Sequence, residues 1–178
     1  MGTRSRWILI LVAGLAAFLA SGAGAYLYAR DLRAGQVTQS CGSRDCIPGL
    51  ETSALLDALR SRGHTCEDKS RGSWMCEMVV GSIHFEVWVE SSDGGVYRLS
   101  PRVFHADEDP LTKAGLAYLT WFAVLPYRDD PAATAEIRNW LTSQTEAGKD
   151  TQATILDYTY VLRTSEKAHV RLDIRIPT

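Results

Sequence analysis

The strongest constraint on this chain is an unbroken apolar segment of 22 residues, Trp7 to Tyr28, which contains no charged side chain. At about 1.5 Å of rise per residue, a helix of this length extends roughly 33 Å and can cross the hydrocarbon core of a bilayer. Its aromatic ends suit the two membrane interfaces. The segment therefore predicts one transmembrane anchor. The chain then divides into a cytoplasmic tail (1–6), the anchor (7–28), a stalk (29–49) and a domain (50–178).

A cleavable signal peptide is the alternative interpretation of this segment. Arg4 and Arg6 would form its basic region, and Ala23-Gly24-Ala25 its small-residue cleavage site. The length of the apolar run and its aromatic end favour retention in the membrane. Because Arg30 and Arg33 follow the segment, the count of basic residues on its two sides is nearly balanced and does not set the orientation.

Four cysteines indicate the orientation instead: Cys41, Cys46, Cys66 and Cys76. An even number in a small domain behind an export signal is typical of disulfides formed in an oxidising compartment, so we expect the domain outside the cytoplasm. Of the three possible pairings we expect Cys41 with Cys46 and Cys66 with Cys76, and the other two stay open. Gaps of four, nineteen and nine residues match neither paired zinc knuckles nor a redox C-x-x-C motif.

Composition limits the class of the remaining chain. About 150 residues follow the anchor, which is the size of one domain. With 46% hydrophobic and 22% charged residues the composition is that of a globular protein and excludes a disordered chain. The formal net charge of -2 argues against a clustered basic surface for nucleic acid, so we expect no nucleic-acid partner.

Hydrophobic periodicity predicts an α+β domain in the element order α-βββ-αα-ββ. Short turns between the strands imply a five-stranded antiparallel sheet with the helices packed on one face. Thr52 or Ser53 is the expected N-cap of the first helix, and Asp-Pro pairs start the other two. The predicted helices are 53–62, a segment from Asp109-Pro110 to Pro126 and one from Asp130-Pro131 to Gly148, and the predicted strands are 74–80, 83–89, 96–103, 156–162 and 170–176.

Two resemblances accompany this pattern. The element order loosely resembles the α+β fold of secretion chaperones, without a shared sequence motif. An Ala-rich anchor, 15 Arg against four Lys, and the run GLAYLTWFAVLPYRDDPAATAEIRNWL make the chain similar to small uncharacterised membrane-anchored proteins of high-GC Gram-positive bacteria. That resemblance covers most of the domain and implies a membrane location, but it implies no activity.

No motif for catalysis or for a cofactor is present. The four histidines have no partner at diagnostic spacing, and the chain lacks H-E-x-x-H, G-x-S-x-G and Walker sequences. The acidic run 105–109 lacks the alternate ligand spacing and the glycine of a calcium loop, and it is interpreted as a helix N-terminus. We therefore predict no catalytic residue, metal or cofactor.

The candidate binding residues lie on the sheet face expected to point away from the helices. Alternation along 83–89 places Trp88 there, exposed between two carboxylates, as a contact residue. Arg163, Arg171 and Arg175 share this face and form a row that can meet an acidic partner or an anionic envelope polymer. The simpler interpretation is a solvated surface of opposite charges on neighbouring strands.

A second aromatic feature is the stripe Tyr118, Trp121 and Phe122, which could form a ligand groove but is expected to be core. The leading hypothesis is a single-pass, membrane-anchored extracytoplasmic binding or scaffolding protein whose partner is an envelope protein or an anionic polymer. The alternatives are an envelope enzyme, such as a hydrolase, with a site assembled from distant residues, and a cytosol-facing thiol or metal module.

Overall fold

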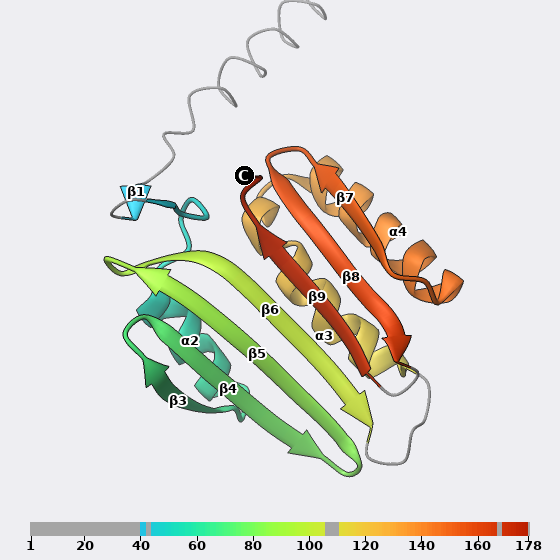
Figure 1. Ribbon diagram of the computed structural model, residues 1–178, viewed down its shortest axis with the longest axis horizontal. Helices are drawn as coiled ribbons and strands as arrows, with labels where there is room; N and C mark the ends of the chain where they lie inside the picture. Colours follow the sequence, from blue (N-terminus) through green and yellow to red (C-terminus); the bar gives the residue numbers. More distant parts are fainter. Residues whose placement is uncertain (1–39, 42–43, 106–110, 167–168, 178) are drawn as a thin grey trace, which may run out of the picture. The chain divides into compact units, whose positions relative to one another are not determined.

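One antiparallel sheet of seven strands, in the order β3-β4-β5-β6-β9-β8-β7, forms the centre of the protein (Figure 1). The computed structural model describes residues 40–41, 44–105, 111–166 and 169–177. The strands of the sheet are β3 (Thr65–Ser70), β4 (Ser73–Val80), β5 (Ile83–Ser92), β6 (Gly95–His105), β7 (Thr151–Ile155), β8 (Tyr158–Glu166) and β9 (His169–Arg175), and the short strands β1 (Ser40–Cys41) and β2 (Arg44–Asp45) pair only with each other.

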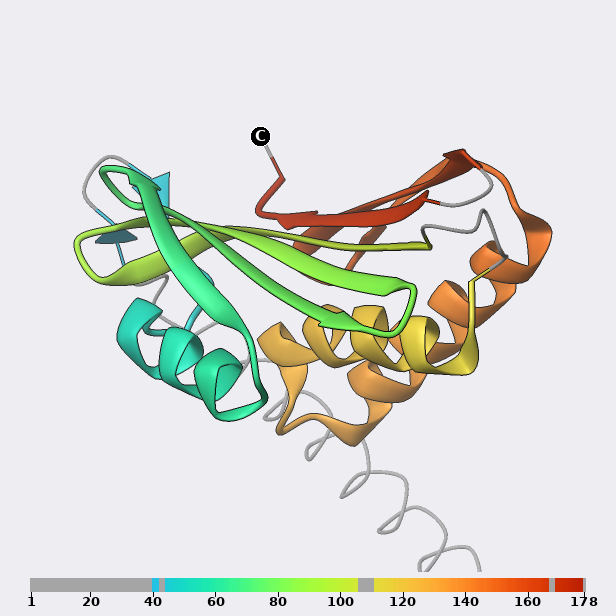
Figure 2. The same ribbon diagram turned by 90° about the horizontal axis from the view of Figure 1, so that it is seen from below.

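Three α-helices lie on one face of this sheet (Figure 2). They are α2 (Thr52–Ser61), α3 (Lys113–Ala123) and α4 (Pro131–Ala147), and a 3₁₀ turn, η1 (Leu125–Tyr127), joins α3 to α4. The predicted α+β class, with an antiparallel sheet and helices on one face, is confirmed. The predicted tail and anchor lie outside the described residues. Among the helices that are described, none is long and apolar enough to span a bilayer.

The sheet has seven strands where the sequence predicted five. The two strands that the prediction missed, β3 and β7, are the two edges of the sheet. The sequence of β3, TCEDKS, is polar and shows no apolar alternation, and β7, TQATI, is short with only two apolar residues; both features are usual for edge strands that must not recruit a further strand. Leu156, predicted to start a strand, instead lies in the β7–β8 turn with a φ of 53°.

The core lies between the sheet and the helices. The inward positions of β5 are Phe85, Val87 and Val89, and all three are buried, as their alternation predicted. Ile47, placed by the sequence at the end of the stalk, also joins this core. Its backbone N–H donates to the carbonyl of Val96 at 2.7 Å and so attaches the segment before α2 to β6.

The helix ends agree only in part with the sequence. Asp130 caps α4 as predicted, because its carboxylate accepts the backbone N–H groups of Ala132 and Ala133 at 3.0 and 3.1 Å. The first helix has no side-chain cap, since Glu51 occupies the N-cap position and the hydroxyl of Thr52 donates to the carbonyl of Gly94. Asp109-Pro110 lies outside the described residues, and the side chain of Thr112 caps α3.

A disulfide joins Cys66 and Cys76, as the preferred pairing predicted. The two cysteines face each other directly across β3 and β4, so the bond ties an edge strand to its neighbour. Cys46 is buried and disulfide-bonded. The side chain of Cys41 lies outside the described residues.

Candidate binding site

The predicted contact residue Trp88 is half-buried and its polar atom is engaged. Its indole N–H donates to Oε1 of Glu86 at 2.7 Å. Glu86 is only 7% exposed, and it also accepts hydrogen bonds from Arg102 on β6 at 2.7 and 2.6 Å. Trp88 therefore belongs to a packed ion-pair network and does not stand exposed between two carboxylates.

The arginines of the predicted row do not act as one group, because they differ in their acidic partners. Arg163 lies opposite Arg171, and Arg171 lies opposite Arg102, so three guanidinium groups are neighbours across β8, β9 and β6. Like charges in such positions repel. Ion pairs offset this repulsion, since Arg163 contacts Asp150 at 3.1 Å and Arg171 contacts Asp173 at 2.9 Å.

Asp173 neutralises much of this surface. Its carboxylate also accepts hydrogen bonds from Arg98 at 3.1 Å and from the hydroxyl of Ser100. Burial alone would raise the pKa of Asp173, but the Ser100 hydrogen bond and the charges of Arg171 and Arg98 outweigh burial and hold that pKa below its ordinary value. Arg175 is exposed and has no ion pair with a described residue. The row is thus mainly an internal charge network, with one free guanidinium at its end.

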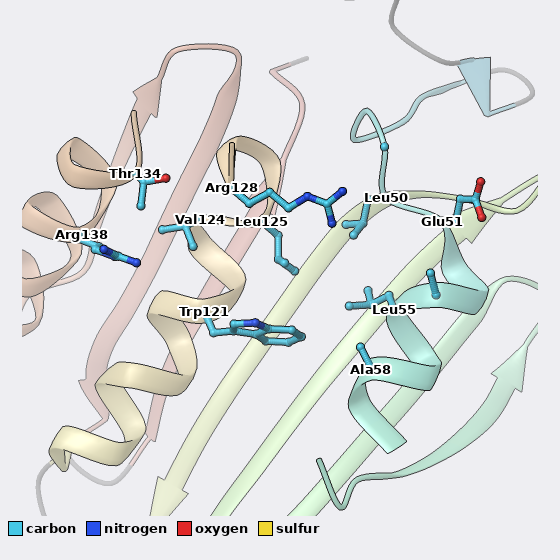
Figure 3. A pocket seen from close by; sticks show the side chains of 12 residues that line it. Leu50, Glu51, Leu55, Ala58, Trp121, Val124, Leu125, Arg128, Thr134 and Arg138 are labelled. Atoms are coloured by element: carbon cyan, nitrogen blue, oxygen red, sulfur yellow. The ribbon is translucent and has the colours of Figure 1, made fainter. Parts of the chain in front are cut away.

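A stronger candidate site lies on the helix side of the molecule, between α2 and α3. A pocket of about 380 Å³ opens there, and the side chain of Trp121 extends from α3 across it towards Leu55 and Ala58 of α2 (Figure 3). Arg128 and Arg138 reach its edge from the segments after α3. The pocket is lined by Gly49, Leu50, Glu51, Ala54, Leu55, Ala58, Trp121, Val124, Leu125, Arg128, Thr134 and Arg138.

A second pocket, of about 480 Å³, adjoins the first on the other side of α3. The two share Trp121, Val124 and Arg138. The second pocket continues between α3 and α4 along Leu116 and Ala117 to Lys113. We call the two adjoining pockets together the Trp121 groove.

Basic side chains dominate the electrostatics of the Trp121 groove. The guanidinium of Arg62 lies 3.9 Å from the centre of the Trp121 ring, which is a cation–π contact. Arg138 and Lys113 form no ion pair with a described residue, and Arg128 has only the exposed Asp129 at 3.4 Å. Glu51 is the only acidic residue among the described residues that line the two pockets. Among the described residues, the lining of the groove thus carries more positive than negative charge.

Two of the hydroxyl groups that line the groove already have partners within the chain. The hydroxyl of Thr120 donates to the carbonyl of Leu116 at 2.7 Å, and that of Thr134 donates to the carbonyl of Tyr127 at 3.0 Å. Thr142 also lines the groove, and most of the other uncharged lining side chains are apolar. The two pockets thus bring together a largely apolar lining and basic side chains. In the part of the chain that is described, no cluster of His, Cys, Asp or Glu could hold a metal ion.

His64 and Tyr118 connect the two helices at one end of the groove. His64 donates from Nδ1 to the carbonyl of Leu59 at 3.2 Å, so its Nε2 can accept the hydroxyl hydrogen of Tyr118 at 3.3 Å. Burial lowers the pKa of His64, with a smaller lowering from the charge of Arg62, against a raising effect of the Leu59 hydrogen bond. The neutral ring thus links the chain after α2 to α3.

The sequence analysis assigned the stripe Tyr118, Trp121 and Phe122 to the core, and the structure separates its members. Phe122 is fully buried, whereas Trp121 is half-buried and lines both pockets. A signal for this was present in the chain, because residues 114–127 contain no charged side chain. A helix that is apolar on all sides is normally covered on all sides, whereas α3 packs on the sheet with one side only.

In comparisons with protein-family models, with curated proteins and with solved structures, the chain matches none of them.

Proposed function

We propose that this chain is a membrane-tethered binding protein whose domain lies outside the cytoplasm and holds an anionic component of the envelope in the Trp121 groove. One observation carries the proposal: an apolar floor around Trp121 lies beside basic side chains that have little acidic compensation. Electrostatic complementarity of this kind selects an anionic ligand, and the apolar floor supplies affinity by burial.

The location is supported by the N-terminal sequence and by the cysteines. The apolar segment 7–28 has the length of a membrane anchor. The 11 residues between this segment and β1, 29–39, can extend at most about 40 Å, which would tether the domain close to the membrane surface. The Cys66–Cys76 bond fits an oxidising compartment.

The location is tested by labelling intact cells with a membrane-impermeant maleimide, with and without prior reduction, and reading the mass shift. Labelling only after reduction is expected, because the cysteines are paired and outside. Labelling that needs a broken membrane and no reductant would place free thiols in the cytosol and support the thiol or metal module.

The site is tested by placing the photoreactive residue benzoylphenylalanine at Ala117, which is exposed and lines the groove. The matched control position is Ala135, which is exposed on α4 and lines neither pocket. Irradiation of intact cells is expected to give a discrete adduct from position 117 and none from position 135. The same adducts from both positions, or none from either, would contradict the groove as the binding site.

A further inference from the structure

We infer that the ligand of the Trp121 groove is a monomeric single-chain amphiphile with an anionic head group, such as a long-chain fatty acid. The acyl chain lies along α3, and the head group meets the guanidinium group of Arg138, which lines both pockets. This inference rests on the proposed function, because it names the class of ligand for the same site.

The size of the groove fits a small ligand. Volumes of about 380 and 480 Å³ fall within the usual range of small-molecule sites, roughly 300 to 1,000 Å³. The apolar strip from Leu116 of α3 to Leu125 of η1 is about 14 Å long at the rise of an α-helix, which gives an acyl chain an elongated floor. A partner helix has a diameter of about 10 Å and needs roughly 800 Å² of surface on each side, more than two shallow pockets offer.

The chemistry of the floor also favours an acyl chain over an extended peptide. The hydroxyl groups of Thr120 and Thr134 already donate to carbonyls of their own helix and of η1. The helices satisfy their own backbone groups, so a peptide strand placed here would bury N–H and C=O groups without partners. An acyl chain has no such groups and loses nothing by this burial.

Charge complementarity specifies the head group. Arg128 and Arg138 both line the pocket between α2 and α3, and Arg138 has no ion pair with a described residue. A carboxylate or phosphate accepts two hydrogen bonds from a guanidinium group, which is stronger and more directional than a neutral contact. A flat membrane surface fits less well, because Trp121 lies within a concave site and carries Arg62 on its ring.

The inference is tested on the full chain in nanodiscs of phosphatidylcholine, which hold the predicted anchor without adding a net anionic lipid. A palmitic acid analogue with a diazirine in its chain is added and irradiated, and the adducts are mapped by mass spectrometry. One saturable adduct per chain is expected, on peptides that cover α2 and α3. Palmitate should compete about tenfold better than hexadecanol, which has the same chain and no charge.

Two groove variants and two matched controls define the site. Ala117→Glu places a negative charge on an exposed groove position, and Arg138→Glu reverses a head-group contact. Ala135→Glu and Arg175→Glu make the same changes at exposed positions outside the groove. Arg138→Glu should lower the adduct yield about tenfold, the effect of losing one charged contact, and Ala117→Glu should lower it by a similar factor, because it places a charge against the acyl chain. Each control should leave the yield unchanged. The far-ultraviolet circular dichroism of all four variants should match that of the parent chain.

Three results would overturn the inference: an adduct that the groove variants do not affect, equal competition by palmitate and hexadecanol, or unsaturable labelling that appears only when phosphatidylglycerol is added to the nanodiscs. The last result would show contact with a membrane surface.

If the amphiphile fails while benzoylphenylalanine at Ala117 still forms its discrete adduct in cells, the ligand class is wrong and the proposed function stands. If both experiments fail, the proposed function falls as well.

Discussion

At the scale of single residues, Glu86 shows how the outer face of the sheet is held. Its side chain is 9% exposed and that of its partner Arg102 is 38% exposed, so the carboxylate is withdrawn from water while the guanidinium group stays partly exposed. A buried carboxylate that loses its partner keeps the cost of desolvation without the compensating attraction. Trp88 adds a third member to the same group through its indole N–H.

Arg102→Met is therefore expected to lower the free energy of unfolding by about 2 kcal/mol, because it leaves Glu86 buried without its cation. Urea unfolding at neutral pH, followed by tryptophan fluorescence, measures the change. The control is Arg175→Met on the same face, which removes an exposed side chain and should change stability by less than about 0.5 kcal/mol. Equal effects of the two substitutions would mean that the buried pair contributes no special stability.

Trp121 and Phe122 are neighbours in the sequence, but we expect Phe122 to contribute mainly to stability and Trp121 mainly to binding. Phe122 is fully buried and packs against Tyr118 and Trp121, so Phe122→Ala should destabilise the fold by about 3 to 4 kcal/mol. Trp121 is half-buried, so Trp121→Ala should cost about 1 to 2 kcal/mol in stability but remove the labelling of the groove. Thermal unfolding and the diazirine adduct yield are measured on the same preparations. If Trp121→Ala instead destabilised the fold as much as Phe122→Ala does, Trp121 would be a core residue.

At the scale of secondary structure elements, α4 is the helix whose two ends are set most directly by the local sequence. Asp130 precedes Pro131, and Gly148 ends the helix with a φ of 62°, a left-handed conformation that glycine adopts without strain. The carboxylate of Asp130 accepts two backbone N–H groups of the first turn. These signals are local in the chain, which is why the sequence predicted both ends of α4.

Asp130→Ala should lower the free energy of unfolding by about 1 kcal/mol, since it removes a helix cap. The neighbouring Asp129→Ala provides a control with the same change of charge, because Asp129 forms only an exposed pair with Arg128 and should contribute close to zero. Urea unfolding of both variants measures the difference. If the two variants are equally stable, the effect of Asp130 comes from its charge and not from its cap.

The edge strands were harder to predict than the helices. β3 and β7 are held by hydrogen bonds to one neighbour each, and they bury few side chains. Alternation of apolar and polar residues reveals a strand when one of its faces is buried. A strand made mostly of polar residues, such as β3, has no such alternation and is missed. The Cys66–Cys76 pair was the one sequence signal that pointed to β3, because directly paired strands bring two cysteines together.

At the scale of the whole molecule, two sets of helices meet over the middle of one sheet (Figure 2). α2 lies over the half of the sheet that contains β4 and β5, and α3 and α4 lie over the half that contains β8 and β9 (Figure 1). The pocket between α2 and α3, the first of the two that form the Trp121 groove, lies where these sets meet. The contacts of His64 with Tyr118 and of Arg62 with Trp121 join the two sets.

The junction is expected to weaken in acid, because the pKa of buried His64 lies below its ordinary value of about 6.5. The unfolded chain then binds a proton at a higher pH than the folded protein does, so stability is full above about pH 6.5 and falls as the pH drops below it. His64→Gln should flatten the dependence of unfolding free energy on pH between about pH 7 and 5. Urea unfolding across that range tests this, and an unchanged slope in the variant would assign the dependence to other groups.

Asp173 is expected to make stability depend on pH in a second, more acidic range. Its lowered folded-state pKa means that its stabilisation is present above the ordinary carboxyl range near pH 4 and is lost as the pH falls through the lower folded value. Asp173→Asn should therefore remove part of the acid sensitivity below about pH 4 and leave the His64 window unchanged. Urea unfolding between about pH 5 and 2 measures this, and loss of the higher window instead would contradict the assignment.

The sequence by itself determined the α+β class, the inward faces of β5 and β9 and the ends of α4, and it made Cys66–Cys76 part of the preferred pairing, because periodicity, caps and turns act between residues close in the chain. Only the tertiary structure decided that Trp121 leaves the core while Phe122 stays in it, and that Arg62, Arg128 and Arg138 gather around one apolar floor. Those residues belong to separate segments, and their proximity follows from how α2 and α3 pack on a sheet of seven strands. Packing of this kind depends on contacts distant in sequence, which no local pattern records.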